Sequence, residues 1–280
     1  MSLDLALHLR VGAGFRLADV DPASTPGFLG NKKDGAKSLA AEQPELDKLQ
    51  ELLFANKEHD PRSVLLVLQG MDTAGKGGIV RHVVGTVDVQ GVHIRAFKKP
   101  TAEELAHDFL WRVRRELPDP GYLGVFDRSH YEDVLIGRVR QLADADEIER
   151  RYGAINDFEA ELVAAGTVVV KAMLHISPAE QHARLAERLE RPDKYWKFNP
   201  GDLEERALWP DYQEAYQVAL ERTSTDVAPW HVVPADHKWY ARLAIQELLV
   251  DAFRSLGQGW PPPDFDVAEQ RAALEASRVD

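Results

Sequence analysis

The sequence predicts an α/β fold in which a parallel five-stranded sheet carries helices on both faces. Two observations indicate this class. Compact apolar runs, β-branched or aromatic in character, alternate with helical segments, and a glycine-rich turn separates the first run from the helix after it. Strands buried on both faces form such continuous runs, and their alternation with helices implies βαβ crossovers.

Each expected strand is an apolar run of about three to seven residues, a usual strand length. In chain order the runs are VLLVL (64–68), VHIRA (92–96), YLGVF (122–126), VVVKAML (168–174) and, after Trp230, the shorter HVV (231–233). Helices are expected in the segments between and after them, at 77–87, 102–116, 130–142, 147–165, 179–190, 203–222 and 237–256.

The two ends of the chain differ from this regular part. Residues 1–45 hold several prolines and glycines without sustained periodicity, which predicts an irregular arm over the body and a short helix beginning near Glu45. Residues 46–256 are expected to form the main domain. Residues 257–280, in which three prolines precede an alanine-rich stretch, are expected to be a tail used in packing or assembly.

Composition restricts the class of protein. Formal net charge is −12, from 34 basic and 46 acidic residues, which by itself argues against nucleic acid, an anionic membrane or any other polyanion as partner. With no cysteine there can be no disulfide, thiolate metal site or cysteine nucleophile, and we expect a cytoplasmic protein. No apolar run is long enough to span a membrane, and the first residues lack a secretory pattern.

The glycine-rich turn, GMDTAGKGG at residues 70–78, matches the phosphate-binding pattern G-x-x-x-x-G-K between a strand and a helix. Glycines allow successive backbone N–H groups to converge on phosphate oxygens, and the helix start adds its positive dipole end. Lys76 brings a charge to the phosphoryl group that is transferred. The glycines expected to shape this site are Gly70, Gly75, Gly77 and Gly78.

Carboxylates near this turn predict a Mg²⁺ site. Gly77 stands where the usual pattern has a Ser or Thr hydroxyl for the metal, so another oxygen must hold it, and Asp72 is the candidate. The third apolar run ends at Asp127, as in a Walker B strand, which makes Asp127 the second candidate ligand. Arg128, beside it, is expected to bind phosphate.

The residues after Arg128 have both local and functional interpretations. Ser129 and Glu132 have the spacing of a helix capping box, and we expect Ser129 to be the N-cap residue. Glu132 fits either the cap or a nucleotide pocket. His130 and Tyr131 are expected to pack.

A basic segment, about 184–215, has the composition of a mobile lid. Arg184 and Arg188 are four residues apart and so share one helix face, and a proline follows Arg191. A charged helix face is often merely solvated. In P-loop kinases, however, a lid after the fourth strand closes arginines over the phosphates and excludes water. Arg184, Arg188, Arg191 and Lys197 are therefore candidate phosphate ligands.

Three motifs in register, GMDTAGKGG, GVFDRSHYEDVL and RLERPDKYWKFNPGD, resemble the polyphosphate kinase 2 family from about Leu65 to Arg254. The glycine after the loop lysine is characteristic of that family. The resemblance implies a P-loop kinase core with a helical lid, Mg²⁺ dependence and a basic channel for polyphosphate. It matches Asp72 and Lys76 to the functional loop residues, Asp127 and Arg128 to the Asp-Arg pair, and the lid arginines and Lys197 to polyphosphate-facing positions.

The resemblance implies phosphoryl transfer from inorganic polyphosphate to ADP, forming ATP, with AMP open as an acceptor, and a homo-oligomer such as a dimer or tetramer. Two other functions stay open: an ATP-dependent nucleoside or nucleotide kinase, and a non-catalytic assembly protein that binds polyphosphate or nucleotide. A polyanionic substrate agrees with the net charge only if basic residues cluster locally. Residues 76–140 hold 11 Lys and Arg against 9 Asp and Glu, in a chain that is acidic overall.

Overall fold

The computed structural model describes residues 5–278 and has a five-stranded, all-parallel sheet at its centre, with strand order β2-β3-β1-β4-β5. All five expected strands are confirmed: β1 (Ser63–Gln69), β2 (Val92–Ala96), β3 (Leu123–Asp127), β4 (Thr167–His175) and β5 (Trp230–Pro234). The central strand β1 is buried along its whole length, because β3 and β4 flank it and helices cover both faces.

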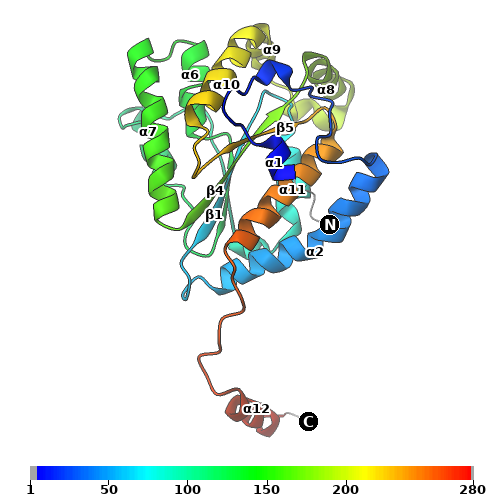
Figure 1. Ribbon diagram of the computed structural model, residues 1–280, viewed down its shortest axis with the longest axis vertical. Coiled ribbons are helices and arrows are strands. Elements are labelled where there is room, and N and C mark those ends of the chain that lie inside the picture. Colours follow the sequence, from blue (N-terminus) through cyan, green and yellow to red (C-terminus); the bar gives the residue numbers. More distant parts are fainter. Residues whose placement is uncertain (1–4, 279–280) are drawn as a thin grey trace.

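Helices cover both faces of the sheet, as predicted. Figure 1 shows α6 (Ile136–Val139) and α7 (Ala145–Ala164) on one side, and α2 (Lys32–Ala55) and α11 (Lys238–Ser255) on the other. The helices α8 (Pro178–Glu190), α9 (Gly201–Ala207) and α10 (Trp209–Thr223) gather at one end of the molecule (Figure 1). They include the expected lid segment, about 184–215, and a 3₁₀ turn, η5 (Pro192–Lys197), lies between α8 and α9.

Several expected helices are divided into shorter pieces. The segment 77–87 forms α3 (Lys76–His82) and a 3₁₀ turn (Val84–Thr86), while 203–222 forms α9 and α10. Residues 102–116 form only α4 (Ala102–Leu105) and α5 (Trp111–Arg114), since the Asp108 side chain accepts from the Leu110 N–H and favours a turn there. The segment 130–142 begins with a 3₁₀ turn, η4 (His130–Asp133), before α6.

The prediction of an irregular arm with a helix beginning near Glu45 was wrong about the helix. The helix α2 begins at Lys32, where the Asn31 side chain and Asp34 form a capping box, and it continues through Pro44. Proline removes one hydrogen bond, but packing of α2 on α11 outweighs this cost. Gly35 lets the helix approach closely, since a Cβ there would lie 2.3 Å from the Trp239 ring.

Residues before α2 do lie over the body, as the sequence suggested. The short helix α1 (Leu5–Leu9) buries both its end residues, and Val11 N–H donates to the Trp230 carbonyl (2.8 Å). Arg10 forms an antiparallel bridge with His231 of β5. This arm therefore covers an edge strand that would otherwise expose unpaired backbone groups.

The C-terminal tail leaves the body. Figure 1 shows α12 (Val267–Ala276) apart from the other elements, and none of its residues is buried. No helix within residues 5–278 is long and apolar enough to cross a membrane.

The contact between α2 and α11 brings together two carboxyl groups, those of the buried Glu247 and the half-buried Glu42. Burial, together with the hydrogen bond and negative charge of Glu42, raises the pKa of Glu247 to about 8. Asp251 raises this pKa further, and Arg254 opposes the increase. A raised acid pKa means that the folded chain holds a proton that the unfolded chain has released.

We expect Glu247→Gln to remove a loss of stability at high pH. The wild-type stability should fall as the pH rises from about 4.5 to about 8, because the folded state holds the additional proton. The glutamine variant lacks this titration. One pKa unit corresponds to about 1.4 kcal/mol. At pH 9 the free energy of unfolding of the variant should therefore exceed that of the wild type by at least that amount. Urea unfolding at pH 6 and pH 9 tests this, with Glu51→Gln at an exposed position of α2 as control. Parallel pH profiles for all three proteins would contradict it.

Candidate functional site

The glycine-rich turn forms a loop at the carboxyl end of β1, between β3 and β4. The sheet register pairs Leu68 with Asp127, and Gln69 with Met173, so the ends of three strands meet beside the loop. The Arg128 N–H donates to the Leu68 carbonyl (3.0 Å), which fixes Arg128 next to the loop. Parallel strands thus bring together the two motifs that are more than 50 residues apart in the chain.

Two of the four expected glycines are required by the backbone. Gly70 and Gly75 have φ angles of 148° and 122°, in a region that other residues rarely adopt. A Cβ on Gly70 would also lie 2.7 Å from the Leu174 carbonyl oxygen. Gly77 and Gly78 have ordinary φ angles, and both line the cavity beside the loop. At Gly77 a Cβ would meet no atom within 4 Å.

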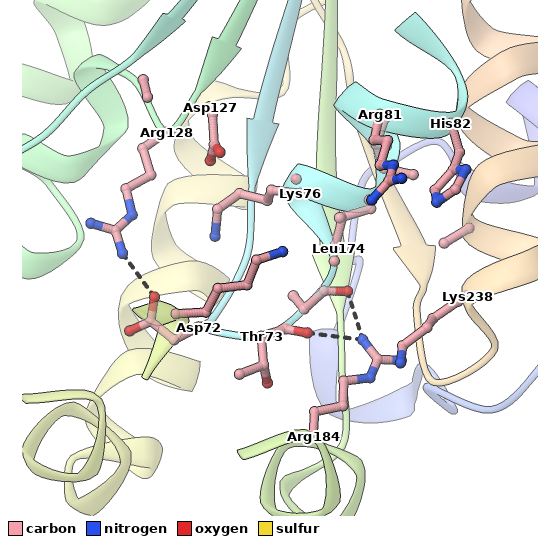
Figure 2. A pocket seen from close by; sticks show the side chains of 18 of the residues that line it. Asp72, Thr73, Lys76, Arg81, His82, Asp127, Arg128, Leu174, Arg184 and Lys238 are labelled. Carbon is pink, nitrogen blue, oxygen red and sulfur yellow. Dashed lines mark hydrogen bonds and ion pairs between the residues drawn. The ribbon is translucent and has the colours of Figure 1, made fainter. Parts of the chain in front are cut away.

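Lys76 is the first residue of α3 and one of the few buried charged side chains of the chain. Its Nζ donates to the Gly70 carbonyl (2.7 Å), so the ammonium closes the loop on itself. In Figure 2, Lys76 lies between Asp127 and Arg128 on one side and Arg81 and His82 on the other. The charge is therefore held at the centre of the site.

Asp72, Asp127 and Arg128 also meet here, as predicted. Arg128 Nη2 donates to Asp72 Oδ1 at 2.7 Å (Figure 2). Burial lowers the pKa of Arg128, but the carboxylates of Glu132, Asp72 and Asp127 outweigh burial and raise it, so the guanidinium stays charged. Arg128 has a φ of 64°, an uncommon conformation for a side-chain-bearing residue that often marks functional sites.

The donor set suits a metal ion that arrives with phosphate. Within residues 5–278 no group of three or more acidic, His or Cys side chains could hold a metal alone. Asp72 and Asp127 both line the same cavity, and no hydrogen bond or ion pair to another described residue holds the Asp127 carboxylate. Mg²⁺ commonly binds through one or two carboxylates and substrate phosphates, keeping several waters. The residues therefore fit Mg²⁺ with a phosphate ligand.

A cavity of about 690 Å³ extends from the loop between α3, α8 and the start of α11. Among the described residues, ten Lys and Arg line it against three Asp and Glu, so the local basic cluster expected from the sequence is present. The ten are Lys76, Arg81, Lys98, Arg128, Arg184, Arg188, Lys194, Lys197, Lys238 and Arg242. Such a surface attracts polyanions in spite of the negative net charge.

The four basic residues predicted for the lid have different surroundings. Arg188 and Lys197 line the cavity, and Arg188 Nη1 donates to the Lys197 carbonyl (2.9 Å) and contacts Asp202 (3.2 Å). Arg191 does not line it, because Arg191 is half-exposed and bound to Asp193 (2.7 Å) and Glu187 (3.4 Å). In this arrangement Arg191 therefore pairs with neighbouring carboxylates instead of lining the cavity. Arg184 lines the cavity, but protein oxygens accept from all its N–H groups.

Glu132 lies in a second, smaller cavity of about 220 Å³ on the other side of the Asp72–Arg128 pair. Ser129 caps η4 through the Tyr131 N–H (3.2 Å), as predicted, whereas the Glu132 carboxylate lies 3.0 Å from the amide of Gln69 and makes no capping bond. Burial raises the pKa of Glu132, although Arg128 and Lys76 oppose the increase. Of its two interpretations, the structure therefore favours the pocket over the cap.

A buried polar network supports the segment that carries Arg128 and Glu132. Lys171 Nζ, in the middle of β4, donates to Glu159 Oε2 (2.5 Å), the Tyr131 hydroxyl (2.9 Å) and the Thr223 carbonyl (2.6 Å). His130 lies 3.3 Å from the same carboxylate. His130 and Tyr131 pack internally, as predicted, and they fix η4 to β4 and α7.

Several residues of the cavity could not be identified from the sequence. Arg81 and His82 end α3, and Lys238 and Arg242 lie in the first turns of α11, more than 150 residues later. Their only local signal is a basic residue near a helix terminus, which is common on any surface. Their shared location follows from the packing of α3 on α11.

Comparison with known proteins identifies similar chains. Residues 30–257 match the family model described as polyphosphate kinase 2. A curated protein of Meiothermus ruber, named AMP/ADP-polyphosphate phosphotransferase, is 44% identical over 261 residues, covering 93% of this chain and 96% of that protein. A protein of Rhodopseudomonas palustris, named ADP-polyphosphate phosphotransferase, is 40% identical over 91% of both chains.

A solved structure has the same fold. The crystal structure of polyphosphate kinase 2 from Arthrobacter aurescens superposes with a TM-score of 0.95 and 59% sequence identity. The match covers 98% of this chain and 97% of that one.

Proposed function

This chain belongs to the polyphosphate kinase 2 family, and we propose that it transfers a phosphoryl group from inorganic polyphosphate to ADP, forming ATP, with AMP as a second acceptor. Relatives at 40–44% identity carry names for this reaction, one with ADP and one with both nucleotides. The observation that supports the assignment best is the basic cavity at the phosphate loop, since a donor that is a chain of phosphates needs many cations along its length.

The arrangement on the two sides of Arg128 supports separate places for donor and acceptor. The larger cavity is basic, whereas the smaller one contains Glu132, Asp202 and Glu205 together with Tyr212. Asp72 and Arg128 line both cavities. A polyphosphate end in the larger cavity and a nucleotide phosphate in the smaller one would therefore meet at this pair.

The chain's own residues supply positioning and charge for an in-line transfer. Lys76 and Arg128 stabilise negative charge on the phosphoryl oxygens, and loop N–H groups hold the donor phosphate. Arg188 and Lys197, from the lid, add charge at the cavity wall and help to exclude water. Arg128 exchanges its contact with Asp72 for one with phosphate. No covalent enzyme intermediate is needed.

We propose Mg²⁺ as the cofactor, held by Asp72 and Asp127 with substrate phosphates. When bound, this ion neutralises phosphate charge and orients the reacting groups.

A donor–acceptor matrix tests the proposal. Polyphosphate or ATP as donor is paired with AMP, ADP, GMP and GDP, with Mg²⁺ present, and products are separated by chromatography. We expect ATP from polyphosphate and ADP, and ADP from polyphosphate and AMP. Reactions without polyphosphate control for transfer between two ADP molecules. Strict dependence on ATP as donor would instead identify an ordinary nucleotide kinase, and binding without turnover would identify a non-catalytic protein.

A further inference from the structure

We infer that Arg184, assisted by Gln181, is a positioning residue that holds the phosphate loop in its binding conformation, and that it does not bind polyphosphate itself. The inference rests on the proposed function, because it assigns a role in that reaction. Both residues lie on one face of α8, and both are almost completely buried. From the sequence alone, Arg184 is a candidate phosphate ligand.

All five N–H donors of Arg184 have protein acceptors. Its Nε donates to Glu180 (2.8 Å), and its Nη1 donates to the carbonyls of Thr73 and Ala74, both at 2.9 Å (Figure 2). Its Nη2 donates to the carbonyls of Ala235 (2.6 Å) and Asp236 (3.0 Å). A guanidinium has five N–H donors, so none remains for a phosphate oxygen.

The acceptors in the loop are consecutive. Gln181 Nε2 donates to the Asp72 carbonyl (3.1 Å), so α8 binds the carbonyls of Asp72, Thr73 and Ala74 in turn. In a planar trans peptide the carbonyl of one residue and the N–H of the next point in opposite directions. Because these carbonyls are held toward α8, the N–H groups of Thr73 and Gly75 are directed away from α8. The N–H group of Ala74 instead donates to the Met71 carbonyl within the loop (3.0 Å).

The loop conformation needs such support. Thr73 has a φ of 66°, a conformation that is strained for a β-branched residue. Its hydroxyl is buried without a hydrogen-bond partner, so its side chain does not stabilise this conformation. Arg184, which lies outside the loop, donates to the Thr73 carbonyl, and this bond opposes relaxation of Thr73 to a negative φ.

The same contacts connect the loop to the lid. Arg206 of α9 donates to Gln181 Oε1 (2.7 Å) and to the Pro178 carbonyl (2.9 Å). Asp236 accepts from the N–H of Ser177, the N-cap of α8. The base of the lid, the phosphate loop and the turn after β5 are therefore joined through one helix face, which also fixes the position from which Arg188 enters the cavity.

Kinetics of Arg184→Met test the inference. Loss of the contacts should lower kcat about 100-fold, the scale of a misplaced catalytic loop, and leave the KM for polyphosphate within about twofold. Thr73→Gly provides a second comparison, because glycine adopts the positive φ without strain. The loss caused by Arg184→Met should shrink to about tenfold in the Thr73→Gly background.

Amide hydrogen exchange supplies a readout that does not depend on turnover. Amides of residues 70–76 should exchange at least about tenfold faster in Arg184→Met than in the wild type. Arg62→Met is the matched control, since Arg62 also binds a carboxylate (Asp60) and a backbone carbonyl (Leu256, 2.7 Å) but precedes β1, at the opposite end of the strand. It should leave kcat and loop exchange unchanged.

The outcomes separate this inference from the proposed function. An increased KM for polyphosphate with unchanged kcat and unchanged loop exchange would show that Arg184 binds the polymer directly, and would overturn the inference. If the wild type fails to use polyphosphate, the proposed function fails, whereas the exchange experiment still decides whether Arg184 holds the loop.

Discussion

Lys76→Ala should lower kcat for polyphosphate-dependent ATP formation by about 1,000-fold, the scale expected when a charge that stabilises the transition state is removed. Lys76 is buried at the centre of the loop, and its Nζ binds only the Gly70 carbonyl (2.7 Å) among the described residues. Loss of this one bond should change the thermal midpoint by only about 5 °C. Turnover and thermal unfolding, measured on the same preparation, check both expectations.

Two further variants separate the charge of Lys76 from its shape. Lys76→Met keeps most of the side-chain stem without the charge, and should be as inactive as the alanine variant. Lys57→Ala is the matched control, because Lys57 packs over the Phe54 ring (4.7 Å) before β1 and does not line the cavity. Near-normal ATP formation by Lys76→Met would contradict the proposed role of the loop lysine.

Asp127→Asn should lower kcat by about 100- to 1,000-fold and raise the Mg²⁺ concentration needed for half-maximal activity, because the amide is a much poorer Mg²⁺ ligand than the carboxylate. The substitution conserves shape. It should leave stability nearly unchanged, since the Asp127 carboxylate has no hydrogen bond or ion pair to a described residue. Mg²⁺ titration of activity is the primary measurement.

Metal binding can be measured without turnover. A Mn²⁺ titration in the presence of ADP, followed by electron paramagnetic resonance, should show weaker binding in Asp127→Asn. Asp157→Asn, at an exposed position of α7, is the control and should bind Mn²⁺ as the wild type does. Wild-type turnover and Mn²⁺ affinity in Asp127→Asn would mean that other ligands hold the metal.

The positions of the glycine-rich loop and of Asp127 could be predicted because their signals are local. The strand before each motif is buried on both faces, so its central residues form an apolar run that is easily recognised. The loop pattern needs only a few adjacent residues and a helix after them. Once the strands were expected to be parallel, their carboxyl ends had to meet at one edge of the sheet, which placed Asp127 and Arg128 beside Lys76.

The helix α2 could not be predicted in full, because its stability depends on a distant partner. Pro44 and Gly35 both disfavour a helix when judged locally. In the folded chain Gly35 is the residue that allows contact with Trp239, and packing on α11 outweighs the cost of the proline. Tertiary packing reversed the local preference.

The surroundings of the basic residues in the lid also could not be predicted from the local sequence. Arg184, Arg188 and Arg191 all occupy α8 or its end, and their sequence surroundings did not separate them. Arg188 lines the cavity, Arg191 pairs with its neighbours on the surface, and Arg184 binds the loop backbone. Whether a charged side chain can bind a ligand depends on where its helix places it and on how many of its donors protein groups already occupy, and the local sequence specifies neither.

The sequence by itself determined the α/β class, the order of strands along the chain, the place of the glycine-rich loop and the family resemblance, since each depends on short segments or on residue order. The tertiary structure alone decided which cations face the cavity and which are already paired, where α2 begins, and that Lys238 and Arg242 join the site. These features depend on contacts between residues far apart in the chain, which no local pattern specifies.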